Sequence, residues 1–335
     1  MMKGHLNNLL QNLKKIRLMK IYEENIAEKV SNEQLMDELK KDLFVRFTNK
    51  GNNEIYIFSH DQAPGLMKEV GRLREISFRA AGGGTGKSLD IDEFDMSTKP
   101  FKQLIVWDPE KKDIIGGYRY ILGNETERDE TGMPLTPTSE LFDISKQFVD
   151  KYWDRTIELG RSFVQPLYQP SINRKGIFSL DNLWDGLGTL IHDNPKMDFF
   201  FGKFTMYPVF HNKARDIIYH FLKRYFPDHE RLMKPKFPIH IEHDTGDIEE
   251  DFAWKNYDDD YKTLVRKVRD LGENIPPLVN AYMNLTKTMK VFGTSLNSHF
   301  SNVFETGILL KISHLVPEKQ ERYVTPYRNF KMGLE

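Results

Sequence analysis

One stretch in the first half of the chain decides the fold. It runs Gln103-Leu-Ile-Val-Trp-Asp108, then Pro109-Glu-Lys-Lys-Asp113, then Ile114-Ile-Gly-Gly-Tyr-Arg-Tyr-Ile-Leu122. Its outer parts are rich in β-branched and aromatic residues, which favour strands, and its middle part has the polar residues of a turn. The pattern predicts two antiparallel strands joined as a hairpin.

Further helices and strands are expected on both sides of this hairpin. Apolar residues at helical spacing predict helices over 66–78, 178–192, 211–225 and 276–289. Apolar runs bounded by turn residues predict strands over 156–164, 199–204 and 303–312. The order of these elements indicates an α/β (α+β) fold with a mixed, mainly antiparallel sheet flanked by helices.

The composition of the 335 residues is that of a folded globular protein. Hydrophobic residues make up 39% of the chain, and 48 basic side chains balance 49 acidic ones. The net charge of -1 gives no reason to expect a nucleic acid as partner. The absence of cysteine excludes thiolate nucleophiles, and His240 and His243 lack a third ligand at a recognisable spacing, so no metal site is expected.

The chain is expected to divide into a short N-terminal segment and one larger domain. Residues 1–50 are expected to form a basic amphipathic helical segment, because leucines recur at helical spacing among lysines in 1–20. Such a helix either packs on its own domain or lies on an anionic membrane. The start of the chain lacks a secretory signal, so we expect a cytoplasmic protein, with residues 1–20 as a candidate peripheral contact at the inner membrane face. The domain spans 51–335 with an excursion at about 205–274, whose part 227–262 is expected to be irregular.

Two motifs resemble known functional motifs, but the sequence around them does not fit the structure that those functions require. Ala81-Gly-Gly-Gly-Thr-Gly-Lys-Ser88 nearly spells a phosphate-binding P-loop, but a charged helix precedes it and an acidic segment follows it. We expect a flexible loop at the mouth of a substrate site instead. His211 and Asp216 have the spacing of a catalytic pair in glycerolipid acyltransferases, but residues five apart on a helix point in different directions. We expect an exposed helix start there.

Charged residues interrupt the apolar pattern of the predicted helix, loop and strands. They are Arg74, Asp92, Asp95, Arg119, Glu158 and Arg161. Residues three apart on a strand face opposite sides, so Glu158 and Arg161 share a face only if a bulge intervenes, and Gly160 is a natural place for one. These residues form either surface salt bridges or the polar groups of an active site.

The order of these blocks resembles the GNAT-fold enzymes that take acyl chains from acyl carrier protein. The sequence follows the pattern Leu-Arg-x-x-x-Phe, Asp-x-x-Asp, Gly-x-Arg and Glu-x-x-Arg, with further blocks at 183–186 and 275–278. It is most similar to bacterial amino-acid N-acyltransferases that make lyso-ornithine and glycine lipids, often labelled haemolysin-related. Acyl-homoserine-lactone synthases are more distant. Members commonly carry Tyr-Arg after the third strand, where this chain has Tyr168-Gln169.

The resemblance implies a GNAT-like domain that transfers a (3-hydroxy)fatty acyl group to the α-amine of an amino acid such as ornithine or glycine. The donor would be a phosphopantetheine thioester, acyl-ACP or acyl-CoA, which is a substrate and not a tightly bound cofactor. In a GNAT fold the third and fourth strands splay, and the third strand, here with Ser162, Phe163 and Val164, binds the pantetheine arm. Arg174 or Lys175 would contact its phosphate.

Direct attack of an amine on a thioester requires a base and a stabilised oxyanion. Glu158 is the candidate base, or the group that orients the amine, and Arg161 lies beside it in sequence. The acceptor pocket is assigned as a group to Arg74, Asp92, Asp95 and Arg119, because arginine binds a carboxylate and aspartate an ammonium.

The expected partners are acyl carrier protein and the amino-acid acceptor. An acidic carrier protein requires a basic docking face. Its candidates, which are equally compatible with a solvated helix face, are Lys203, Lys213, Arg215, Lys223 and Arg224. The alternatives to an aminolipid N-acyltransferase are a signal synthase of the acyl-homoserine-lactone type and a non-catalytic module that binds an acyl carrier or lipid.

Overall fold

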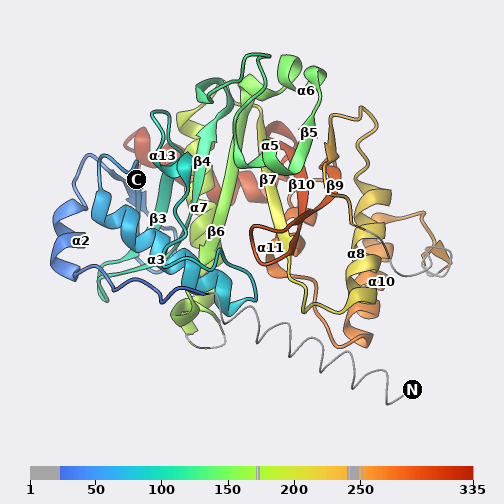
Figure 1. Cartoon of the computed structure of the whole chain (residues 1–335), viewed down its shortest axis with the longest axis horizontal. Helices are drawn as coiled ribbons and strands as arrows, with labels where there is room; N and C mark the ends of the chain where they lie inside the picture. The colour runs from blue at the N-terminus through green and yellow to red at the C-terminus, as the bar shows by residue number, and fades with distance from the viewer. Residues whose placement is uncertain are drawn as a thin grey trace.

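The protein is built on one large sheet, seen in a computed structural model that describes residues 23–334 except 171, 173, 240, 242–248 and 251 (Figure 1). The eight strands lie in the order β1-β2-β3-β4-β6-β7-β10-β9. Their bounds are β1 Phe44–Phe47, β2 Glu54–Phe58, β3 Lys102–Asp108, β4 Asp113–Leu122, β6 Thr156–Val164, β7 Phe199–Met206, β9 Lys290–Asn297 and β10 Val303–Lys311. Neighbouring strands are antiparallel except β6 and β7, which are parallel. The mixed, mainly antiparallel sheet predicted from the sequence is therefore confirmed.

Helices cover both faces of this sheet, because β3 alternates apolar residues toward each side. Leu104 and Val106 belong to the core on the face covered by α7 (Ser179–Asp193) and α8 (Asn212–Tyr225), whereas Ile105 and Trp107 belong to the core on the face covered by α3 (Pro64–Ala80). The remaining helices are α2 Asn32–Glu38, α4 Glu93–Met96, α5 Pro137–Leu141, α6 Lys146–Lys151, α10 Tyr257–Asp270, α11 Pro277–Met283, α12 Pro317–Tyr323 and α13 Thr325–Lys331. No helix in the described part of the chain is both long and apolar enough to span a membrane.

The face that α3 covers is shared with a smaller layer. That layer contains α5, α6 and a two-stranded sheet of β5 (Phe142–Ile144) and β8 (Met233–Pro235), and its aromatic core packs against Phe201 and Leu309. Short 3-10 helices lie at η1 Gly123–Glu125, η2 Trp153–Arg155, η3 Pro166–Tyr168, η4 Arg174–Phe178 and η5 Ile312–His314. Figure 1 shows α3 and this smaller layer over adjacent parts of the sheet, and they meet near β6.

Several predicted elements need correction. The helix expected over 276–289 ends at Met283, and the strand β9 follows at Lys290. β9 was not predicted because it is an edge strand with a mixed polar sequence. Residues 44–47, expected to be helical, form β1. The stretch 227–262 is not irregular throughout, because it contains β8 and the start of α10, whose Leu264 packs in the main core. Residues 1–22 lie outside the described part, so the membrane-helix hypothesis stays a prediction.

The sheet opens between β6 and β7. Their parallel pairing covers only Thr156↔Phe199, Ile157↔Phe200 and Glu158↔Phe201. Beyond Glu158, β6 continues to Val164 paired with β4 alone, and β7 continues to Met206 paired with β10 alone. The two strands therefore form a split that begins at Glu158.

A β-bulge lies on β6 beside this split. Gly160 pairs with Arg119 and Phe163 with Gly117, so two residues of β6 lie opposite Tyr118 alone. Arg161 has a φ of 52°, in the left-handed region that non-glycine residues rarely adopt. The bulge predicted next to Gly160 is present, and the strained residue is Arg161 itself.

Candidate active site

The bulge brings the charged residues of three elements to one face of the sheet. Arg119 and Ile121 share a face of β4, and Ile121 pairs with Glu158 across to β6. Arg161 contacts the same aspartate as Arg119, Asp92, which precedes α4. Glu158 and Arg161 therefore lie on the face of the sheet that α3 covers.

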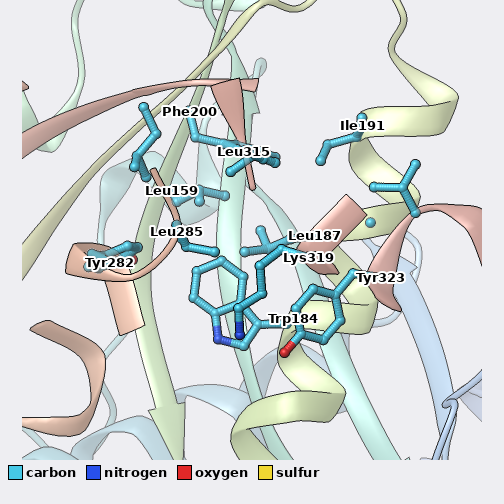
Figure 2. Close-up of a pocket in the computed structure, with 13 residues that line it drawn as sticks. Leu159, Trp184, Leu187, Ile191, Phe200, Tyr282, Leu285, Leu315, Lys319 and Tyr323 are labelled. Carbon is cyan, nitrogen blue, oxygen red and sulfur yellow. The ribbon is translucent and has the colours of Figure 1, made fainter. Parts of the chain in front are cut away.

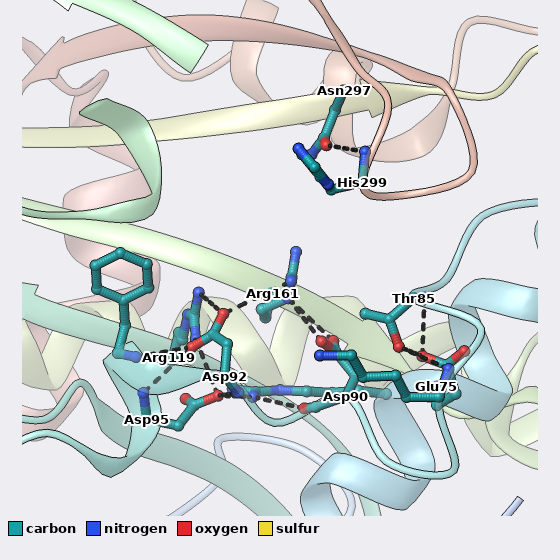
Figure 3. Close-up of polar contacts among 12 residues, drawn as sticks. Glu75, Thr85, Asp90, Asp92, Asp95, Arg119, Arg161, Asn297 and His299 are labelled. Atoms are coloured by element: carbon teal, nitrogen blue, oxygen red, sulfur yellow. Dashed lines mark hydrogen bonds and ion pairs between the residues drawn. The ribbon is translucent and has the colours of Figure 1, made fainter. Parts of the chain in front are cut away.

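Three arginines and three aspartates form a buried network on this face (Figure 3). Arg119 donates both Nη groups to Asp92, at 2.6 and 2.8 Å, and its Nη1 lies 2.9 Å from Asp95. Arg74 pairs with Asp95 at 3.2 Å, and Arg161 Nε lies 3.0 Å from Asp90. The network links α3, the loop before α4, β4 and β6.

The aspartates of this network differ in how burial and charge balance. Burial raises the pKa of Asp90, although Arg161 and Arg74 oppose the rise. Burial acts in the same direction on Asp95, but Arg119 and Arg74 outweigh it and hold the pKa of Asp95 below its usual value. Asp95 is therefore ionised and fixed between two guanidinium groups.

Gln103 at the start of β3 completes the network. Its Nε2 donates to Asp95 Oδ1 at 2.9 Å, and its Oε1 accepts from Arg74. Within the described residues, Nε of Arg74 and of Arg119 are buried without a hydrogen-bond partner, but each guanidinium is paired through its Nη groups. Arg74 and Arg119 are almost completely buried, so they hold the loop around 90–95 rather than facing solvent.

A second polar group lies where the split begins. Glu158 is 2% exposed, and its Oε1 accepts from the Thr138 hydroxyl of α5 at 2.5 Å. Lys203 of β7 donates to the same hydroxyl at 2.7 Å, and its Nζ lies 3.8 Å from Glu158 Oε1. Glu158 Oε2 is buried and has no hydrogen-bond partner among the described residues. This group therefore has an acceptor atom left for another molecule.

Charged side chains of both signs lie around Glu140 of α5. Burial raises the pKa of Glu140 on α5, and Glu93 and Asp92 add to the rise, while Lys203 and His299 oppose it. In Figure 3, His299 lies on the loop after β9, on the other side of Arg161 from the aspartates.

An apolar pocket lies on the opposite face of the sheet (Figure 2). Leu159, the first residue of β6 beyond the last pair with β7, lines it together with Trp184 and Leu187 of α7, Phe200 of β7 and Tyr282 of α11. Successive residues of a strand point to opposite faces, so Glu158 and Leu159 place a carboxylate and an apolar side chain on the two sides of the split.

The glycine-rich loop 81–88 does not form a nucleotide site. The N–H groups of Thr85 and Gly86 donate to Glu75 at 3.0 and 2.8 Å, so a carboxylate of the chain occupies the amides that a phosphate would need. The next helix, α4, begins only at Glu93. Ser301 donates to Gly84 O at 2.9 Å, which holds this loop against the connection between β9 and β10.

Comparisons with known proteins agree with this geometry. The acetyltransferase (GNAT) domain family matches residues 73–176. Two curated relatives named "Glycine N(alpha)-acyltransferase", from Phocaeicola vulgatus and Bacteroides thetaiotaomicron, are 49% and 50% identical to this chain over 305 residues. The matched region covers 91% of this chain and 94% and 90% of the relatives. No solved structure matches. This chain belongs to the GNAT acyltransferase family.

The predicted donor-binding strand of this acyltransferase lies along the split. Ser162, Phe163 and Val164 belong to the part of β6 that pairs with β4 and, among the described strands, has no neighbour on its other side. Arg174 and Lys175 lie in η4, after that strand, but their side chains are outside the described part. Donor contacts by these residues stay predictions.

The carrier docking face of the acyltransferase needs correction. Lys203 is 11% exposed and Arg215 4%, and Arg215 pairs with Asp216 at 2.8 Å, so neither belongs to a solvated docking surface. Of the predicted residues, Lys223 and Arg224 are exposed, and Lys213 is half-buried.

The residues that sequence reasoning missed at the site are Thr138, Gln103, Asp90 and the inward-facing Lys203. Lys203 interrupts an aromatic strand, Phe199-Phe-Phe-Gly-Lys-Phe204, which was an available signal.

Proposed function

We propose that this acyltransferase transfers a fatty acyl group from a phosphopantetheine thioester to the α-amine of glycine. The observation that carries the proposal is the split between β6 and β7, which begins at a buried carboxylate with one oxygen unpartnered among the described residues. The names of the two relatives favour glycine over ornithine as acceptor. They also favour this function over a lactone-forming signal synthase or a non-catalytic binding module.

The split supplies the shape that a thioester arm requires. Beyond Glu158, the edge of β6 that faces β7 has no strand partner, so an extended amide-containing arm can add there as a strand. The arm would bring its thioester to the position where the strands separate. The carrier of the arm is acyl carrier protein or coenzyme A, and the former agrees with the family resemblance.

The apolar pocket behind Leu159 supports a fatty acyl group on this donor. Its lining is almost entirely aliphatic and aromatic, with Lys319 as the charged member. A thioester placed in the split would have the acyl chain on the pocket side and Glu158 on the other. The two substrates would then meet from opposite faces of the sheet.

The chain's own residues would support direct transfer. The amine of glycine is mostly protonated at neutral pH, and a base must remove a proton before it can attack. Glu158 Oε2 would accept that proton, directly or through a water. The nitrogen then bonds to the thioester carbon and gives up a second proton, the carbon–sulfur bond breaks, and the departing thiolate takes up that second proton to become the free thiol. No enzyme nucleophile is needed.

Product analysis tests this proposal. The purified enzyme is incubated with glycine or ornithine and with the same 3-hydroxyacyl chain on acyl carrier protein or coenzyme A, and products are identified by mass spectrometry. We expect N-acylglycine as the main product and a Glu158→Gln variant that forms little. Absence of any N-acyl amino acid with both donors would overturn the proposal.

Salt dependence tests the carrier. If an acidic carrier protein docks on basic residues, turnover with the carrier-bound donor falls as ionic strength rises, while turnover with the coenzyme A thioester changes less. Equal salt sensitivity of the two donors contradicts a carrier docking face.

A further inference from the structure

Lys203 is an ammonium group that is nearly buried yet only partly used. Its side chain is 11% exposed and lies on β7, next to the last residues that pair with β6. Its one hydrogen bond within the described part of the chain goes to the Thr138 hydroxyl, although an ammonium has three donors. A buried charge with unused donors is costly unless a ligand or water completes it.

Glu158 presents the complementary atom. Its Oε1 is occupied by Thr138, and its Oε2 is buried without a partner among the residues the structure describes. Lys203 Nζ lies 3.8 Å from Glu158 Oε1, so a free acceptor and free donors lie close together at the start of the split. An α-amino acid suits this pair, because it carries an ammonium and a carboxylate on the same carbon.

The arginines nearby are less suited to a carboxylate. Arg74 and Arg119 are buried and paired with Asp95 and Asp92. Arg161 is partly exposed, but it faces two carboxylates, Asp90 at 3.0 Å and Asp92 at 3.7 Å. Lys203 forms an ion pair with one carboxylate, Glu158, at the longer distance of 3.8 Å and with the neutral Thr138 hydroxyl between them, and its charge also acts on Glu140.

We infer that Lys203 binds the carboxylate of the acceptor amino acid while Glu158 Oε2 receives its amine. The inference deepens the proposed function and rests on it. A zwitterion bound in this way adds no net charge to a buried site, whereas an amine without a carboxylate leaves Lys203 with its donors unpaired. The enzyme should therefore require an amino acid rather than a simple amine.

The test compares glycine with glycinamide, which has the same amine and no carboxylate. In Lys203→Met the KM for glycine rises at least about 30-fold, the scale of losing one partner of a buried charge pair, and the KM for glycinamide changes little. Lys203→Gln keeps a polar contact with Thr138 and is used if Lys203→Met folds poorly. It should show the same pattern, a raised KM for glycine and a nearly unchanged KM for glycinamide. Lys102→Met, a lysine on β3 of the same sheet that is 45% exposed, is the control and leaves both KM values unchanged.

The opposite results overturn the inference. Equal losses with glycine and glycinamide, or a fall in kcat at constant KM, place Lys203 on the thioester or on Glu158 instead. If Arg161→Met, and not Lys203→Met, abolishes the difference in KM between glycine and glycinamide, Arg161 binds the carboxylate of the acceptor. If wild type prefers another amino acid, the comparison uses that amino acid and its amide, so a wrong acceptor and a wrong role for Lys203 give different results.

Discussion

Two groups of buried charges lie side by side on the same face of the sheet and are built differently. In the arginine–aspartate network, each aspartate lies within 3.0 Å of an arginine nitrogen. In the group of Glu158, Thr138 and Lys203, the ion pair is 3.8 Å long, a hydroxyl lies between the charges, and one carboxylate oxygen is unpartnered within the described residues.

This difference suggests that the arginine–aspartate network stabilises the fold and that the group of Glu158, Thr138 and Lys203 is available to a substrate. Charges that neutralise one another at close range fix the elements that carry them, and they have little left for a ligand. Charges with unused donors and acceptors gain most when a substrate arrives. We therefore expect changes in the network to affect mainly stability, and changes in the second group to affect mainly turnover.

The largest expected effect is the loss of Asp95 from the network. Asp95→Asn leaves the buried guanidinium of Arg74 without its carboxylate, because its other contacts are Gln103 and a backbone carbonyl. Removing one partner of a buried ion pair costs about 3–5 kcal/mol, so the free energy of unfolding in urea should fall by that amount. Asp150→Asn, which breaks an exposed pair with Lys146, is the control and should change it by less than about 0.5 kcal/mol. A small loss in Asp95→Asn would show that the network does not support the fold.

Glu158→Gln should give the reverse pattern. The amide keeps the size of the side chain and an acceptor for Thr138, but it cannot take a proton. We expect kcat to fall at least ~10²-fold with little change in urea unfolding. The exposed Glu130→Gln on the connection before α5 is the matched control. Turnover near that of wild type in a folded Glu158→Gln variant removes Glu158 from the mechanism.

The elements that carry the network could be predicted from the sequence, which assigned Arg74, Asp92, Asp95 and Arg119 to an acceptor pocket rather than to support of the fold. The hairpin of β3 and β4 has uninterrupted strand-forming residues, and α3 has an apolar stripe, so local periodicity was enough. The charged residues Arg74, Asp92, Asp95, Arg119 and Arg161 stood out because they interrupt those patterns, and the structure brings them together. Parity along β6 also predicted the bulge beside Gly160.

The group of Glu158, Thr138 and Lys203 depends on contacts between residues that lie far apart in the sequence. Thr138 lies on a short helix with no strong pattern, and it reaches Glu158 and Lys203 only because α5 packs over the split. A lysine is exposed by default, so Lys203 was assigned to a docking surface. Lys203 lies on a strand between two others, because β10, which is distant in the sequence, pairs with β7 and places Gly307 opposite Lys203.

A buried carboxylate outside both groups sharpens the comparison because its hydrogen bonds come from a neutral residue, although the charges of Arg46 and Arg322 also act on it. Asp185 on α7 accepts from Asn49 N and Nδ2 at 2.9 and 2.6 Å. Burial raises its pKa to about 6. The folded state then holds the proton of Asp185 more tightly than the unfolded state. The contribution of this proton to the free energy of unfolding is fully present below pH ~4 and is lost as pH rises through about 6. From pH 4 to 7 we expect wild type to lose roughly 2–3 kcal/mol relative to Asp185→Asn. Parallel stability curves for the two proteins would contradict this.

The smallest expected effect concerns Thr138, which acts through Glu158. Thr138→Val keeps the shape of the side chain and removes the hydroxyl between Glu158 and Lys203. The two charges can then approach each other directly, and the loss of the hydrogen bond at Oε1 lets the carboxylate of Glu158 turn. We expect kcat to fall about 10-fold, the loss associated with one hydrogen bond to a charged group.

Thr138→Ser separates positioning from packing. Serine restores the hydroxyl but not the methyl group, so it should recover kcat to within about 3-fold of wild type if the hydrogen bond is what matters. Valine should instead be the better replacement if α5 needs only to fill space against β6. Because the two variants move in opposite directions under the two explanations, their ratio of kcat values decides whether the hydroxyl holds Glu158 in its working orientation.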